Sequence, residues 1–311
     1  MKTYILEGVV TALSSISHNG GERNGTITQL RREKFVQPDG KVAKVPVISG
    51  NAIRGIMRDR GMFNMLVQLG YGVNSDTGEV KGLPLQAFYF LFSGGSLVST
   101  GTEGLDIKHF REMRQAIPLI SLFGGAAGNV IMPGKVKIGK LLPLCKETAH
   151  LVPDRFLPET TETIWEYCQT EMYTRRDDEK NDRVRMLINR PLLGDGTEAP
   201  IEKKAPQQMK YDVETLAAGT QFYWKLVLED VTDVEFEAFL ATILEFSKSP
   251  VVGGKGGVGH GEISIKLDKW IEVDSRVNLN GTEVDVKLGT KYQQHLETFG
   301  DSIRKFLHDM K

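Results

Sequence analysis

Two long segments of the chain carry apolar residues at helical spacing, and each is flanked by segments with the character of a β-strand. They cover residues 49–70 and 231–249, and both predict amphipathic α-helices. Their repeating apolar residues are Ile53, Ile56, Met57, Phe63, Leu66 and Val67 in the first, and Phe236, Phe239, Leu240, Ile243 and Phe246 in the second. The residues suited to cap or end them are Ser49 or Asn51 and Gly70 for the first helix, and Thr232 with Glu235, a capping box, for the second.

Four strand-like segments surround these helices. They cover residues 3–13, 135–138, 219–229 and 262–267, and they are rich in alternating apolar and polar residues. The order along the chain is then strand, helix, strand, strand, helix, strand. This order predicts an α+β fold with a ferredoxin-like or RRM-type core.

The remaining segments are predicted to be insertions in one domain that covers residues 1–311. A chain of this length, with 40% hydrophobic and 25% charged residues, has ordinary globular composition. Residues 71–117 are expected to be a helical insertion, and residues 150–213, highly charged with a turn-rich centre, a long hairpin or arm. Residues 290–311 are predicted to form a C-terminal helix. Residues 14–35 have the composition of a polar, glycine-rich loop.

Bulk properties exclude some classes of protein. The net charge is −1, so a nucleic-acid site must be a local basic patch. The two cysteines, Cys145 and Cys168, do not form a disulfide framework. The first residues do not resemble a signal peptide, and no window is apolar enough to span a membrane. We therefore expect a soluble, cytoplasmic protein with no membrane partner.

A glycine-rich stretch at residues 253–261, "GGKGGVGHG", raises the question of a nucleotide-binding loop. In a phosphate-binding loop the glycines are followed by Lys and then Ser or Thr, but here His260 and Gly261 hold those positions. A strand pattern follows, where a helix would be required. The stretch therefore predicts either a tight structural turn or a turn whose backbone lies against a polyanion.

Basic residues gather in the segment between residues 17 and 60. The cations are Arg23, Arg31, Arg32, Lys34, Lys41, Lys44, Arg54, Arg58 and Arg60, and the opposing acids are Glu22, Glu33, Asp39 and Asp59. On the predicted helix, Asn51, Arg54 and Arg58 share one face, and the helix N-terminus offers free N–H groups. This pattern is typical of a phosphate-binding surface, although a solvated polar face would give the same spacing.

Four of these segments together resemble the RAMP superfamily of CRISPR-associated proteins. They occur in the order found in that superfamily: "VPVISGNAIRGIMRDRG" at 45–61, "PLISLFGG" at 118–125, "AAGTQFYWKLVLE" at 217–229 and "GGKGGVGHGEISI" at 253–265. Within the superfamily the chain is most similar to the backbone subunit of multi-subunit effector complexes, and best to that of type IV.

The resemblance implies a non-catalytic scaffold that polymerises along a CRISPR guide RNA and presents its spacer for pairing in antiviral or anti-plasmid interference. The implied partners are the guide RNA, a complementary target nucleic acid with DNA favoured over RNA, further copies of the chain and other effector-complex subunits. No cofactor is implied. The candidate RNA-binding residues are Arg23, Arg31, Arg32, Ser49, Asn51, Arg54, Arg58, Gly253, Gly254, Lys255, Gly256, Gly257 and His260.

The resemblance also implies that the charged arm is a β-hairpin "thumb" inserted before the strand at 219–229. Its candidate functional residues are Arg175, Arg176, Arg183, Arg185, Met186 and Leu187. By resemblance, Met186 or Leu187 wedges between bases of the guide; the alternative is that both pack against a neighbouring copy.

The alternative function is a metal-dependent RAMP ribonuclease, which would cleave target RNA or process the guide. Related RNA-cleaving subunits carry an Asp in the loop after the first strand, and Thr28 holds that position here, with Glu22 nearby. His18 is the only candidate for a guide-processing histidine. The six histidines have no metal-ligand spacing, so we predict no metal site and no catalytic residues. A third interpretation, without the resemblance, is a ferredoxin-like enzyme with a small-molecule pocket.

Overall fold

Four strands of the main sheet form the core of the protein. The computed structural model describes residues 1–73, 80–95, 107–127, 130–176, 194, 208–268, 270–274 and 278–310. The core strands are β1 (Lys2–Ala12), β10 (Val136–Ile138), β14 (Gln221–Val231) and β15 (Ile263–Leu267). They lie in the order β15–β1–β14–β10, and each neighbouring pair is antiparallel.

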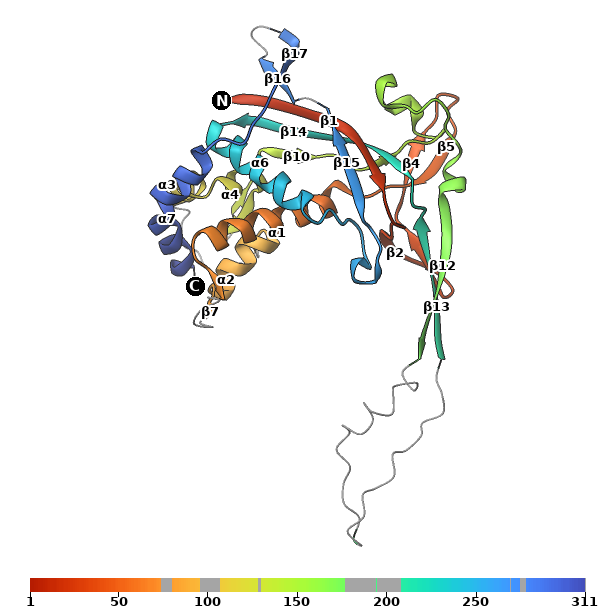
Figure 1. The fold of residues 1–311 in the computed structure, drawn as a ribbon, viewed down its shortest axis with the longest axis horizontal. Helices are drawn as coiled ribbons and strands as arrows, with labels where there is room; N and C mark the ends of the chain where they lie inside the picture. Colours follow the sequence, from red (N-terminus) through yellow and green to blue (C-terminus); the bar gives the residue numbers. More distant parts are fainter. Residues whose placement is uncertain are drawn as a thin grey trace.

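Two helices connect these strands and lie together on one face of the sheet (Figure 1). They are α1 (Gly50–Gln68), between β1 and β10, and α6 (Asp233–Ser247), between β14 and β15. The predicted α+β class and ferredoxin-like core are therefore confirmed. The predicted caps are also confirmed: Ser49 caps α1, and Thr232 with Glu235 forms a capping box at α6.

Strand alternation decides which side chains enter the core. Along β14, Phe222, Trp224, Leu226 and Leu228 are buried, as the period-2 pattern predicts. Tyr223 and Lys225 lie on the opposite face of the sheet. The buried residues of β1, β14, α1 and α6 form one hydrophobic cluster.

The opposite face of the sheet is covered in part by the chain itself. Two short 3₁₀ turns, Ala149–Leu151 and Asp154–Phe156, follow strand β11 (Leu142–Pro143). Leu144, Val152 and Phe156 form a second small core there against Val9 and Tyr223. Glu7 fixes this layer, because its carboxylate accepts hydrogen bonds from Arg155 and from the Tyr223 hydroxyl, both at 2.6 Å.

Further helices extend the α-helical side of the molecule. They are α2 (Leu85–Phe88), the π-helix η1 (Tyr89–Ser93), α3 (Ile107–Ala116), α4 (Pro118–Phe123) and α7 (Lys291–Asp309). The described part of the predicted helical insertion at 71–117 contains α2, η1 and α3. Helix α7 lies where a C-terminal helix is predicted. No helix in the described ranges has the length and apolar character needed to cross a membrane.

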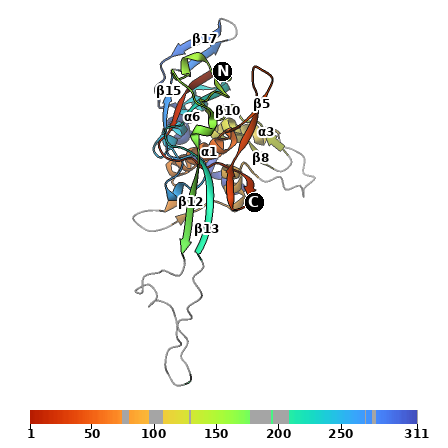
Figure 2. The ribbon, with the colours of Figure 1, turned by 90° about the vertical axis from the view of Figure 1, so that its right-hand side faces the viewer.

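A long β-hairpin projects from the body of the protein in both views (Figures 1 and 2). It is made of β12 (Cys168–Arg176) and β13 (Gln208–Leu216), which pair along their full length. The predicted hairpin therefore exists, but its strands begin at residue 168. Residues 150–167 instead contain short 3₁₀ turns joined by irregular segments, and the last of these turns is Ile164–Tyr167.

The prediction of a loop over residues 14–35 is wrong. This segment contains β2 (Asn19–Asn24), β3 (Ile27–Leu30) and most of β4 (Arg32–Val36), which pairs with β5 (Val42–Pro46). Strand β3 pairs in parallel with β13 and thereby joins the hairpin base in a four-stranded sheet. The polar sequence suits β2 and β3, because the described side chains of β2 are exposed and those of β3 are half-buried up to Leu30, which is buried.

The remaining strands are short or lie at the edge of the sheet. They are β6 (Gly72–Val73), β7 (Val80–Lys81), β8 (Gly125–Ala127), β9 (Val130–Met132), β16 (Trp270–Asp274) and β17 (Asn278–Val284). Strand β16 pairs with the beginning of β1, so the main sheet continues into a hairpin that the sequence does not predict.

The close packing of α1 on α6 gives a test of the fold. A Cβ atom at Gly61 would lie 2.5 Å from Oγ1 of Thr242, which is buried and bonded to the Ala238 carbonyl. We expect Gly61→Ala to lower the free energy of unfolding by about 1–3 kcal/mol, because overpacking outweighs the better helix propensity of Ala. Urea unfolding measures the change.

The matched control is Gly55→Ala in the same helix, since no atom lies within 4 Å of a Cβ there. This variant should be stabilised by up to about 1 kcal/mol. In a Thr242→Ala background, Gly61→Ala should lose most of its destabilising effect. Equal stabilisation by both glycine substitutions in the native background would contradict the packing of α1 on α6.

Candidate nucleic-acid interface

Helix α1 begins against the loop that follows β1. The side chain of Ser49 accepts a hydrogen bond from the Ala52 N–H at 3.2 Å, and the Ser49 N–H donates to Nε2 of His18 at 3.2 Å. Asn51 is exposed in the first turn, which contains no acidic residue. The positive end of the helix dipole is therefore not neutralised by an acid of the helix itself.

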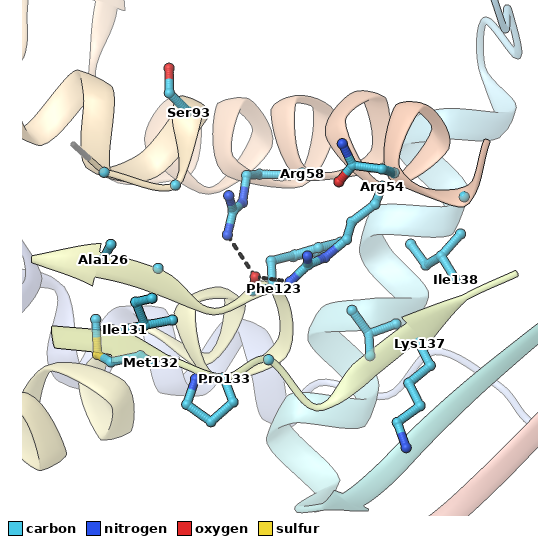
Figure 3. Close-up of a pocket in the computed structure, with 17 residues that line it drawn as sticks. Arg54, Arg58, Ser93, Phe123, Ala126, Ile131, Met132, Pro133, Lys137 and Ile138 are labelled. Carbon is cyan, nitrogen blue, oxygen red and sulfur yellow. Dashed lines mark hydrogen bonds between the residues drawn. The ribbon is translucent and has the colours of Figure 1, made fainter. Parts of the chain in front are cut away.

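Arg54 and Arg58 are half-buried and do not lie on a solvated helix face. Both guanidinium groups turn toward the end of α4, where Phe123 and Gly124 present their carbonyl oxygens (Figure 3). Arg54 donates to the Phe123 oxygen, and Arg58 donates to the same oxygen at 2.7 Å and to the Gly124 oxygen. The Nε atoms of both arginines have no partner among the described residues. The two arginines thus hold the turn after α4 against α1.

These arginines line a cavity of about 870 Å³ between α1, the end of η1, the β8–β9 hairpin and β10. We call it the arginine cavity. The 17 described residues that line it include three cations, Arg54, Arg58 and Lys137, and no acid. Lys137 is bonded to Glu229, so the uncompensated charge belongs to the two arginines.

The electrostatics of the arginine cavity favour an anion. Burial lowers the pKa of Arg54, and burial together with the neighbouring Arg54 charge lowers the pKa of Arg58 to about 10. Both groups remain protonated at neutral pH in a partly desolvated place. No described lining residue is a carboxylate, and the neighbouring Asp59 offsets only part of the effect on Arg58. A phosphate group bound here would compensate that charge and accept charge-assisted hydrogen bonds.

The glycine-rich loop at 253–261 packs against the rest of the protein. The Gly254 N–H donates to the Ser17 carbonyl at 2.6 Å, and the Gly261 N–H donates to the Ser15 carbonyl at 2.9 Å. Gly253 has a φ of +79°, and a Cβ there would lie 2.5 Å from the Ser17 oxygen. The conformation therefore requires glycine for a structural reason. Gly254, Gly256 and Gly257 remain exposed, so their backbone is accessible to a ligand.

Two side chains of this loop contact the base of the hairpin. The Lys255 ammonium lies 4.8 Å from the ring centroid of Tyr173 and 4.6 Å from that of Tyr211, and these two rings are stacked on each other. His260 is buried, and its Nε2 contacts the Tyr173 hydroxyl. The loop is thus a joint between the main sheet and the hairpin, and His260 is not accessible to RNA.

Glu171 strengthens this joint. Its carboxylate accepts hydrogen bonds from Tyr173 and Thr215, each at 2.9 Å, and from Gln169 at 3.0 Å. Burial alone would raise the pKa of Glu171, but these hydrogen bonds and that of Ser15 lower it to about 2. The ionised carboxylate is therefore part of the folded hairpin base at neutral pH.

The arginines of the β2–β3 region have different environments. Arg31 is exposed. Arg32 is largely buried and forms a two-pronged ion pair with Glu214 of β13, with one N–O distance of 2.7 Å, while its guanidinium lies 5.4 Å from the Trp165 ring. Its charge is thereby compensated within the protein. Arg23 lies on β2, but its side chain is outside the described residues.

The predicted hairpin residues lie at or beyond the edge of the described structure. Arg175 and Arg176 belong to β12, and their side chains are not described. Arg183, Arg185, Met186 and Leu187 fall outside the described residues. Their roles stay predictions.

The residues considered for catalysis have structural contacts. Thr28 lies on β3, paired with Val213 of the hairpin. His18 is half-buried and accepts the Ser49 N–H, and burial together with the charge of Arg31 lowers its pKa. Within the described ranges, no three His, Cys, Asp or Glu side chains are grouped so that they could hold a metal ion.

The structure thus brings Ser49, Asn51, Arg54 and Arg58 together at the start of α1, beside the arginine cavity. It brings the glycine-rich loop together with the base of the hairpin at a second site. Lys137 and the Phe123–Gly124 turn were not assigned to the arginine cavity from the sequence. The motif "PLISLFGG" marked that turn, but the role of its carbonyl groups depends on tertiary contacts.

Comparison with known proteins finds relatives among solved structures only. No family model matches the sequence, and no curated protein matches it. Among solved structures, the chain is similar to one described as "Type IV-B CRISPR Complex", with a TM-score of 0.56 and 22% sequence identity. The match covers 92% of this chain and 96% of that chain. At this identity the likeness shows a shared fold over almost the whole chain.

The contact of His18 with the start of α1 predicts a pH dependence of stability. Because the pKa of His18 is lowered in the folded protein, the unfolded chain binds a proton first as the pH falls below about 6.5. Stability should therefore fall between about pH 7 and pH 5.5. The variant His18→Gln, which offers an acceptor that does not titrate, should show a flatter dependence of the urea midpoint over this range. Parallel curves for the two proteins would contradict the role of His18.

Proposed function

We propose that this chain is the RNA-binding backbone subunit of a CRISPR effector complex of the type IV kind. The observation that carries the proposal is the structural likeness to a chain of a type IV-B CRISPR complex, which extends over 92% of this chain and 96% of that one. A likeness over nearly the full length of both chains supports a shared role in assembly better than a match of the common ferredoxin-like core alone would.

The arginine cavity supports RNA as the ligand. Its two arginines have no compensating carboxylate among the described lining residues, and it adjoins the N-terminus of α1. Contacts of this kind are made to phosphates, which are the same in every sequence. A scaffold that must accept many different guide sequences requires such sequence-independent contacts.

The hairpin supports assembly of several copies. It projects away from the sheet and the helices (Figure 2), and its base is fixed to the body by the Arg32–Glu214 ion pair and by Lys255. Because its base is fixed, the hairpin points in a defined direction. A hairpin that contacts a neighbouring copy on the same RNA would need such a direction. The proposed subunit is non-catalytic, since Thr28 cannot act as the metal-binding carboxylate of the cleaving relatives.

The proposal is tested on the protein purified from an expressing cell. We expect a high ratio of absorbance at 260 to 280 nm and helical or crescent-shaped particles in negative stain, which dissociate to monomers after RNase treatment. The bound RNA should remain intact when Mg²⁺ is added, whereas regular cleavage would favour the ribonuclease alternative. Clean monomers that do not bind added RNA would contradict the proposal.

The arginine pair should contribute to RNA affinity through its charge. We expect Arg54→Ala with Arg58→Ala to weaken RNA binding about equally for different sequences. The slope of log affinity against log salt should decrease in magnitude by roughly 1 to 1.5, the value for two lost phosphate contacts on a single strand. Fluorescence anisotropy over a range of salt concentrations measures both effects.

Two control variants separate charge from structure. Arg54→Lys with Arg58→Lys keeps the charges but loses the two-pronged geometry, so the salt slope should be largely retained. Lys287→Ala with Lys305→Ala removes two exposed charges from the C-terminal part of the chain and should leave the slope unchanged. If the alanine pair at 54 and 58 also leaves the slope unchanged, the arginines have only a structural role.

A further inference from the structure

A second cavity adjoins the arginine cavity. It has a volume of about 510 Å³ and shares Gly50, Asn51 and Ile138 with the arginine cavity. We call it the aromatic cavity, because Phe35 of β4 and Tyr223 of β14 line it. The two cavities therefore lie on either side of the start of α1, where a Cβ atom on Gly50 would clash with the Ile138 carbonyl.

The Tyr223 ring is held in a fixed orientation. Its hydroxyl donates to Glu7 at 2.6 Å, and its centroid lies 5.3 Å from that of Phe156. Glu7 is itself buried and bonded to Arg155. A ring fixed from one side in this way presents its remaining surface to the cavity with little conformational entropy to lose on binding.

The charges around the aromatic cavity are compensated, unlike those of the arginine cavity. Lys225 lies 3.2 Å from a carboxylate oxygen of Glu7, and Lys140 is bonded to Glu33. A cavity with two aromatic rings and paired charges suits a flat, uncharged group better than a phosphate. Asn51 is exposed on the shared wall and can both donate and accept hydrogen bonds at the edge of such a group.

We propose that the aromatic cavity holds an unpaired nucleobase of the single-stranded RNA whose phosphates bind in the arginine cavity. Stacking on Tyr223 and Phe35 would hold the base, and Asn51 would contact its edge. The inference rests on the proposed function, because it names the subsite for the same ligand. The position of the subsite fits this inference, because the chain's own 3₁₀ turns cover the middle of the sheet face opposite the helices.

The test uses the full chain freed of nucleic acid and a single-stranded RNA of about eight nucleotides, short enough for one subunit. Tyr223→Leu and Phe35→Leu remove a ring, whereas Tyr223→Phe keeps the ring and removes only the bond to Glu7. We expect the two leucine variants to bind roughly 5- to 100-fold more weakly in fluorescence anisotropy, the loss that follows from one lost stacking contact. Tyr223→Phe should lose less affinity than Tyr223→Leu, because it keeps the ring and loses only the bond that fixes its orientation. Phe63→Leu, an exposed phenylalanine outside both cavities, is the matched control and should bind normally.

A second measurement does not depend on the folding of any variant. The same RNA carrying 4-thiouridine is cross-linked by light to the native protein, and the modified peptide is identified by mass spectrometry. We expect modification at Tyr223 or Phe35. Modification elsewhere only, or leucine variants that are folded and bind RNA normally, would overturn the subsite while the proposed function stands.

Two further outcomes would also overturn the inference. Native protein that binds no RNA at low salt would refute the proposed function and the subsite together. Leucine variants that bind the short RNA normally but no longer self-associate would show that the aromatic cavity receives a side chain of a second copy.

Discussion

The binding of two arginines of α1 to the carbonyl groups of Phe123 and Gly124 determines the form of the candidate site. It joins the first helix of the core to a turn some 65 residues further along the chain. Because carbonyl oxygens accept hydrogen bonds without neutralising charge, the guanidinium groups are positioned and yet remain unpaired cations. A carboxylate in the same place would have given equal order and no attraction for phosphate. The geometry thus combines a rigid site with an uncompensated charge.

The other cations of the chain show why a count of basic residues overestimates a phosphate-binding surface. Arg32 is paired with Glu214, and Lys255 lies against two tyrosine rings. Both side chains fix the hairpin to the body of the protein. Their contribution to RNA binding would be indirect, through the direction of the hairpin and the accessible backbone of the glycine-rich loop.

The sequence predicts those parts of the fold that follow from local periodicity. Apolar residues repeat every two residues in the core strands and every three to four residues in the two core helices. The caps follow from the residue types at the helix ends. The structure confirms all of these elements. The strands within residues 14–35 could not be predicted, because β3 is stabilised by pairing with β13, which lies some 180 residues away. The same holds for the partners of Arg32 and His260, which come from the hairpin. Spacing on the helix placed Arg54 and Arg58 together, but only the tertiary structure shows that they are half-buried.

The covered sheet face has a consequence for where a nucleic acid can lie. In a ferredoxin-like core the face opposite the helices is the natural platform for bases, but here Glu7, Arg155 and Phe156 fix a layer of the chain on it. One uncovered part of this face forms a cavity near Tyr223, beside the start of α1. A strand of RNA that follows this edge would have phosphates on the arginine side and bases on the aromatic side. In the proposed complex, the layer that closes the platform would therefore direct the RNA to the place where the unpaired cations are.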